Sequence, residues 1–175
     1  MKLTKITNVK HFMNKLLIEN AFDSFLISEA CVKTCNTFII DCHINKEFYT
    51  QAELDELAAD AESEDRIYSD RLSRWGTVKP HVLALIKGSK TPLYFKMSFY
   101  LAGENVNKLL SSFDTTIKSG DIDGLSLIVK FENDELIVTS SSTLKIFSLD
   151  KSLDKYWDEM VLKFLSSHEI SYEVM

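Results

Sequence analysis

The chain has few glycines and prolines and no long apolar stretch. Its 175 residues include five Gly and two Pro, against 45% hydrophobic and 11% aromatic residues. This composition excludes a disordered or low-complexity chain and is ample for a packed core. No run approaches the roughly 20 apolar residues of a membrane span. Lys2 and Lys5 are not followed by the apolar stretch of a signal peptide, so we expect no membrane association.

Cysteine is also scarce. Three cysteines, an odd number, do not make a disulfide framework, and we expect reduced thiols in a cytoplasmic protein. Cys31, Cys35, Cys42 and His43 are the one cluster with metal-ligand chemistry, but they lack the Cys-x-x-Cys spacing of zinc sites. Cys42 and His43 also point to opposite faces of an expected strand. We therefore expect no metal and no other cofactor.

Basic residues are absent from one half of a central segment, and acidic residues are scarce in the other half. Residues 50–65 hold seven acidic residues and no basic one, whereas residues 66–96 hold seven basic residues and one acidic residue, Asp70. The net charge of −6 disfavours nonspecific binding of nucleic acid or anionic membrane by the whole surface. Such binding would have to use a locally basic surface, and the basic half of this segment is the main candidate. A second, weaker candidate is the helix at residues 9–17, with Lys10, His11 and Lys15.

The order of the expected elements occurs twice. Lys2–Ile6 reads as a strand that leads into the helical stretch Val9–Leu17, and Tyr94–Tyr100, with Leu101, leads into a second helical stretch. Each helix carries Asn-Lys-Leu-Leu, and each is followed by segments that read as three strands. In the first copy the third strand is expected at residues 47–49. In the second, Asn133-Asp134 and the serines 140–142 are expected to be the turns of a three-stranded meander.

This order predicts an α+β fold: an antiparallel sheet from two strand-helix-three-strand repeats, a helical insert between them, and a C-terminal amphipathic helix. We expect one domain, with repeat one at residues 1–50, the insert at 51–88, repeat two at 92–149, and the last helix with an edge strand at 150–175. In the insert, Thr50 and Glu53 form a capping box. Gly76 is expected to end the first helical region, and Pro80 to begin a short helix.

Two resemblances follow from these features. The layout, with its two Asn-Lys-Leu-Leu helices, resembles one domain of a DNA sliding clamp, although a clamp has no counterpart of residues 51–88. In sequence, Thr37–Asp41, residues 90–96, 104–106 and 143–157 resemble a family of small uncharacterised clostridial bacterial proteins, a domain of unknown function. The clamp resemblance implies DNA-facing helices, and the family resemblance implies no activity.

The basic half of the insert is the candidate site. Its cations, with an aromatic ring and a histidine nearby, would provide phosphate contacts and a surface for base stacking. The simpler interpretation is structural, since acids early and bases late in a helical region complement the helix dipole. The candidate anion-binding or nucleic-acid-binding residues are Arg66, Arg71, Arg74, Trp75, Lys79, His81, Lys87 and Lys90.

No group of residues has the spacing of a catalytic motif. The sequence therefore favours a non-enzymatic binding or interaction protein, with a protein or a nucleic acid as its partner. The alternative is an enzyme of unrecognised type, whose site assembles Asp41, His43, His81 and Lys96 from distant segments. A third alternative is a homo-oligomer formed by edge-strand pairing at residues 171–174.

Overall fold

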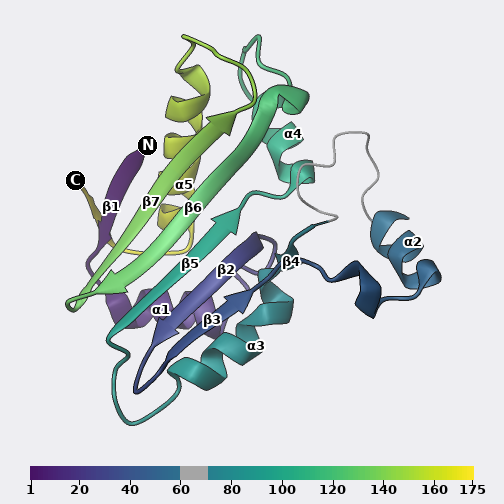
Figure 1. The fold of residues 1–175 in the computed structure, drawn as a ribbon. Helices are drawn as coiled ribbons and strands as arrows, with labels where there is room; N and C mark the ends of the chain where they lie inside the picture. Colours follow the sequence, from purple (N-terminus) through teal and green to yellow (C-terminus); the bar gives the residue numbers. More distant parts are fainter. Residues whose placement is uncertain (60–70) are drawn as a thin grey trace.

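One antiparallel sheet forms the centre of the molecule in the computed structural model, which describes residues 1–59 and 71–175 (Figure 1). Within the described residues the sheet has eight strands, in the order β3-β2-β5-β6-β7-β1-β8, and the short β4 pairs with β2. The strands are β1 (Lys2–Ile6), β2 (Leu26–Lys33), β3 (Thr37–Asp41), β4 (Ser73–Arg74), β5 (Tyr94–Tyr100), β6 (Ile122–Glu132), β7 (Glu135–Leu144) and β8 (Tyr172–Val174).

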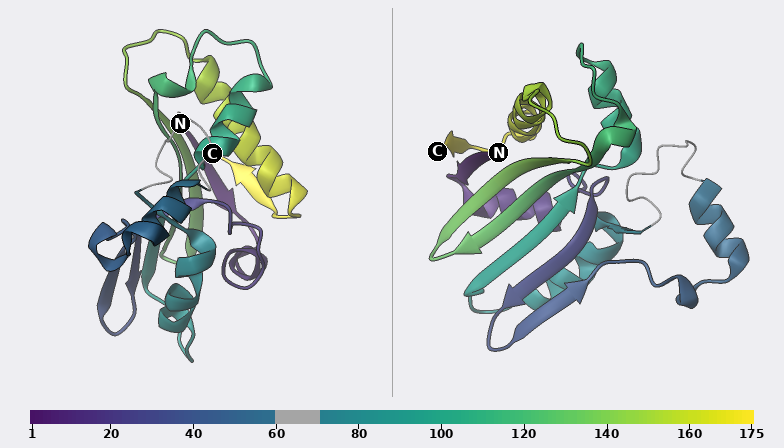
Figure 2. Two further views of the ribbon diagram at one scale, coloured as in Figure 1. Left: turned by 90° about the vertical axis from the view of Figure 1, so that its right-hand side faces the viewer. Right: turned by 45° about the horizontal axis from the view of Figure 1, so that its top comes forward.

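The helices lie mainly on one side of this sheet. They are α1 (Val9–Leu17), α2 (Gln51–Ala59), α3 (Trp75–Ile86), α4 (Gly103–Ser111) and α5 (Ser152–Ser167), with 3-10 turns η1 (Lys46–Phe48) and η2 (Ser119–Asp121). Helices α1, α3, α4 and α5 contribute side chains to one core with the strands. Helix α2 lies apart from the sheet (Figure 2).

Strand alternation decides which side chains enter this core. Phe95, Met97 and Phe99 of β5 are buried, whereas the residues between them are half-buried on the other face. Phe22 is fully buried beneath them and contacts the rings of Phe12, Phe25, Phe99 and Phe164. The aromatic content of the sequence is thus concentrated where the helices meet the sheet.

The predicted fold class is confirmed. An antiparallel sheet, helical segments between the two copies and a C-terminal helix are all present. Strand β1 and helix α1 have the expected bounds. Asn133 and Asp134 both have positive φ, 53° and 61°, as a tight two-residue hairpin turn requires.

The third strand of each copy is where the prediction is wrong. Residues 46–48 form the 3-10 turn η1, and the serines 140–142 continue β7 instead of turning. On the helix-covered face, the Ser140 hydroxyl donates to Asp158 of α5, and the Ser142 hydroxyl donates to Asp154. These partners satisfy the hydroxyls within a strand, so the serines need no turn.

The insert also differs in detail. Its capping box is confirmed, because the backbone N–H of Thr50 donates to the Glu53 carboxylate at 2.7 Å and that of Glu53 to the Thr50 hydroxyl at 3.4 Å. Gly76, however, lies at the start of α3 and does not end a helix, and Pro80 lies inside α3. A Cβ on Gly76 would lie 3.3 Å from Asp23 Cβ, so close packing explains this glycine.

The two copies have different neighbours in the sheet. β5 pairs directly with β6 of its own copy, whereas β1 pairs with β7 and β8 and does not adjoin β2. Each copy therefore supplies a strand, a helix and a two-stranded hairpin, but the pairing does not relate the copies by symmetry. The resemblance to a clamp domain rests on element order alone.

Candidate functional site

The structure places three of the candidate residues of the insert in internal contacts. The ring of Trp75 is fully buried, and its Nε1 donates to the backbone oxygen of Leu16 at 2.8 Å. Arg74 pairs with Glu104 at 3.0 Å, and the half-buried Lys79 pairs with Asp23 at 2.6 Å. Trp75 therefore offers no face for stacking, and both cations already have a carboxylate.

The other described candidates of the insert have exposed side chains. His81, Lys87 and Lys90 are exposed at α3 and in the segment after it, and Arg71 is exposed before β4. Arg66 lies outside the described residues. What the insert offers to a ligand is a few exposed side chains on α3 and in the segment that follows it.

Of the four polar residues of the enzyme alternative, only Asp41 and His43 are in contact. His43 Nδ1 lies 2.5 Å from Asp41 Oδ1 at the end of β3, with both side chains more than half exposed. Hydrogen bonds from His43 lower the pKa of Asp41 below its usual value. Lys96 lies on the uncovered face of β5, while His81 lies on α3, whose Val78 and Val82 pack in the core on the opposite face.

The cysteines show no sign of metal binding. Within residues 1–59 and 71–175, no three His, Cys, Asp or Glu side chains are grouped as a metal site needs. Cys42 is buried with the core, as expected for a small hydrophobe, and Cys35 is exposed. Burial raises the pKa of the Cys42 thiol to about 11, so it is not a reactive thiolate at neutral pH.

The other face of the sheet is open. No helix of the described residues lies across it, and in Figure 1 its strands face the viewer without cover. One cross-strand row of this face follows from the pairing register: Ile39, Cys31, Lys96, Lys130, Ile137 and Lys5. This row crosses six strands, from β3 to β1.

A cluster of three lysines around a tyrosine lies on this face, at one end of the central strands β2, β5 and β6. Lys96 of β5 is directly opposite Lys130 of β6. The backbone bond from Leu101 N to Leu125 O shows that this is a non-hydrogen-bonded pair, in which Cα atoms are about 4.5 Å apart and side chains are closest. The Nζ atoms of Lys33 and Lys130 lie 4.9 Å and 5.8 Å from the centroid of the Tyr94 ring. We call Lys33, Tyr94, Lys96 and Lys130 the lysine–tyrosine cluster.

The charges of this cluster are only partly balanced. Lys130 pairs with Glu132 at 2.7 Å, and this hydrogen bond raises the pKa of Lys130. Lys96 has no ion-pair partner among the described residues. Partial burial raises the pKa of Tyr94, so its hydroxyl stays neutral. Like charges that face each other across two strands destabilise a sheet unless a counter-charge lies between them.

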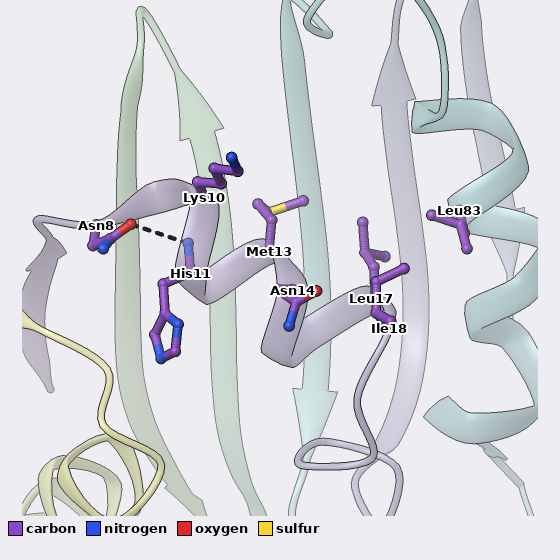
Figure 3. A pocket seen from close by; sticks show the side chains of 8 residues that line it. All are labelled: Asn8, Lys10, His11, Met13, Asn14, Leu17, Ile18 and Leu83. Carbon is purple, nitrogen blue, oxygen red and sulfur yellow. Dashed lines mark hydrogen bonds between the residues drawn. The ribbon is translucent and has the colours of Figure 1, made fainter.

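A hollow lies between α1 and α3. It has a volume of about 490 Å³. Its lining residues are Asn8, Lys10, His11, Met13, Asn14, Leu17, Ile18 and Leu83 (Figure 3). Asn8 caps α1 by accepting from His11 N at 3.0 Å, and Asn14 donates to Glu19 at 2.7 Å. In Figure 3 the His11 ring points away from Leu83, so the polar and apolar sides of the hollow do not converge on one ligand position.

The sequence signals for the lysine–tyrosine cluster are dispersed. Alternation along 94–100 indicates that Tyr94 and Lys96 share a face, but nothing local places Lys33 or Lys130 beside them. Their meeting depends on the registers of β2, β5 and β6, which join distant parts of the chain. Of the cluster, sequence reasoning had singled out Lys96 alone, as part of a catalytic alternative.

These features define an α+β protein with a single sheet that is covered by helices on one face and open on the other. No helix in the described part of the chain is long and apolar enough to cross a membrane. The chain belongs to a family of unknown function (DUF5721), whose model matches residues 15–173. This match confirms the resemblance to a family without an assigned activity. Searches of curated proteins and of solved structures found no match.

Proposed function

We propose that this chain is a non-enzymatic binding protein, and that its partner is a single-stranded nucleic acid held on the open face of the sheet. The observation that carries the proposal is the lysine–tyrosine cluster, in which Lys96 faces Lys130 and, of these two, only Lys130 pairs with a carboxylate, that of Glu132. A phosphate group at this position would supply the missing counter-charge.

The aromatic ring at the centre of the cluster favours a single strand over a duplex. Aromatic side chains on a sheet face stack with unpaired bases, while lysines beside them contact the backbone phosphates. Lys33 and Lys130 lie over the Tyr94 ring. When these lysines turn to phosphates, the face of the ring becomes available to a base. A duplex, whose bases are stacked inside, would gain only the phosphate contacts.

The open face supports this function better than the insert does. In the insert, Arg74 and Lys79 are paired with carboxylates and Trp75 is buried. The exposed His81, Lys87 and Lys90 remain there as an alternative anion-binding surface. The two locations can be separated by experiment, because they share no residue.

The test is fluorescence anisotropy with labelled single-stranded DNA and RNA oligonucleotides over a range of salt concentrations. We expect binding at low salt that weakens as salt rises, since each phosphate contact contributes roughly 0.7 to the slope of log affinity against log salt. The variant K33Q/K96Q/K130Q should bind at least about tenfold more weakly, with a slope lower by about two. The variant Y94L should lose about tenfold in affinity, with an unchanged slope.

The matched control removes charge from the insert instead. The variant H81Q/K87Q/K90Q should bind as the unaltered protein does, because none of these residues belongs to the cluster. If this control lost binding and K33Q/K96Q/K130Q did not, the insert would be the site and the open face would be excluded. Absence of binding by the unaltered protein at low salt would remove nucleic acid altogether.

A further inference from the structure

The two outer strands of the sheet are protected to different degrees. β8 has three residues, Tyr172–Val174, and pairs with β1. β3, at the other edge, has five residues, Thr-Phe-Ile-Ile-Asp, and within the described chain pairs with β2 alone. Proteins normally disrupt an exposed edge with proline, lysine, a bulge or a very short strand. β8 has the last of these protections, whereas β3 has none of the four and carries a single charged residue, Asp41, at its end.

The backbone of β3 offers a regular set of unpaired groups. Thr34 N donates to Asn36 O at 2.9 Å, and Cys42 N donates to Ser28 O at 2.9 Å. Both bonds belong to one antiparallel register, in which Phe38 and Ile40 exchange hydrogen bonds with β2. Because the pattern alternates, the N–H and C=O groups of Thr37, Ile39 and Asp41 point outward from the sheet.

We propose that β3 is a homodimer interface, in which a second copy of this chain pairs with it antiparallel about a two-fold axis through Ile39. In this register Ile39 lies opposite Ile39 of the second copy, and Thr37 lies opposite Asp41. Every outward-pointing residue therefore meets an outward-pointing residue, as a closed two-fold pair requires. The result is one continuous sheet of two copies, with both open faces on the same side.

The side chains are complementary in the same register. On the open face, Ile39 is 66% exposed and would pack against its own copy, and the Thr37 hydroxyl would donate to the Asp41 carboxylate. On the helix-covered face, Phe38, which is 36% exposed, would lie opposite Ile40. No two like charges face each other along the strand. A second copy thus satisfies both the backbone and the exposed apolar side chains of this edge.

This inference does not depend on the proposed nucleic-acid binding, and its test uses the full chain without ligand. We expect a concentration-dependent dimer in sedimentation-velocity runs between 1 and about 100 μM. In the variant I39K a lysine would lie opposite the same lysine of the second copy, and dimerisation should weaken at least about tenfold. The matched control I146K changes an isoleucine that is 49% exposed in the loop after β7, and it should dimerise normally.

A disulfide experiment tests the register itself. Cys31 must first be replaced, since it lies opposite position 39 within the same chain. In a C31S/C35S background, I39C should form a covalent dimer on mild oxidation, because paired Cα atoms about 5.5 Å apart lie within disulfide range. F38C in the same background should not, because position 38 does not face itself.

A monomer at about 100 μM, or an I39K variant that dimerises as well as I146K does, would overturn the proposal. Circular dichroism of each variant establishes that it is folded. A dimer that persists in I39K and is not trapped by I39C would mean that a different surface is used.

Discussion

The two faces of the sheet have opposite characters although they alternate along the same strands. On the covered face, β5 contributes Phe95, Met97 and Phe99 to a core that is sealed by four helices. On the open face, the same strand contributes Tyr94 and Lys96 beside other lysines. One face thus supplies the stability of the fold. The other is not covered by helices, and its residues on β5 are half-buried.

The largest expected difference between the faces is in the cost of removing an aromatic ring. Phe22 is fully buried among four other rings, so F22A should lower the free energy of unfolding by about 3–5 kcal/mol. Y94A removes a half-buried ring on the open face and should cost about 1 kcal/mol. Urea unfolding followed by circular dichroism measures both. Equal losses would show that the open face is as important to the fold as the core.

The two faces should also differ in the reactivity of their cysteine thiols. Cys42 is buried against the covered side, whereas Cys31 is half-buried on the open face and Cys35 is exposed in a turn. At pH 8 we expect Cys35 to react with a disulfide reagent first and Cys31 next. Cys42 should react only when the protein unfolds. Rapid reaction of all three thiols in the folded protein would contradict this order.

The raised pKa of Cys42 also predicts a pH dependence of stability. Burial raises this pKa from 9.0 to about 11, so between these values the unfolded chain has lost the thiol proton and the folded protein has kept it. Stability should therefore fall as the pH rises from about 9 to 11, by about 2 kcal/mol. The variant C42A should lack this component. The measured quantity is the difference between the two proteins, since other groups titrate in both.

The smallest effect concerns the charges of the open face. Lys96 faces Lys130, so K96Q should raise the free energy of unfolding by a few tenths of a kcal/mol at low salt and have no effect at high salt. Lys5 lies in the same row but pairs with Glu135 at 2.6 Å, so K5Q serves as the control. The K5Q substitution should leave the free energy of unfolding unchanged or lower it slightly. A loss of stability in K96Q would mean that this lysine already has a partner.

Local patterns predicted the elements that local forces determine. β1 and α1 were predicted with their observed bounds, and the Asn133-Asp134 turn followed from residues that tolerate positive φ. The serines 140–142 were misread as a turn because their partners, Asp154 and Asp158, lie on a helix further along the chain. Gly76 was misread as a helix end because its packing partner Asp23 is equally remote in sequence.

The candidate site was harder to predict for the same reason. Charge along residues 66–96 indicated a basic segment, but charge alone does not show that Arg74 and Lys79 have partners at Glu104 and Asp23. The lysine–tyrosine cluster brings together three strands, and only the strand registers place Lys33, Lys96 and Lys130 near one ring. A single sequence shows that each residue of this cluster is present, but it does not show which residues lie beside it in the folded sheet.

The position of β1 in the sheet has a consequence for the order of folding. β1 contains residues 2–6, yet its neighbours are β7 and β8, which contain residues 135–144 and 172–174. During synthesis, this first strand leaves the ribosome well before either neighbour exists. We expect the hairpin β6–β7 to form quickly from local contacts and to serve as the template that β1 joins late. Until then β1 remains unpaired, and the sheet is completed only when residues 172–174 have been made.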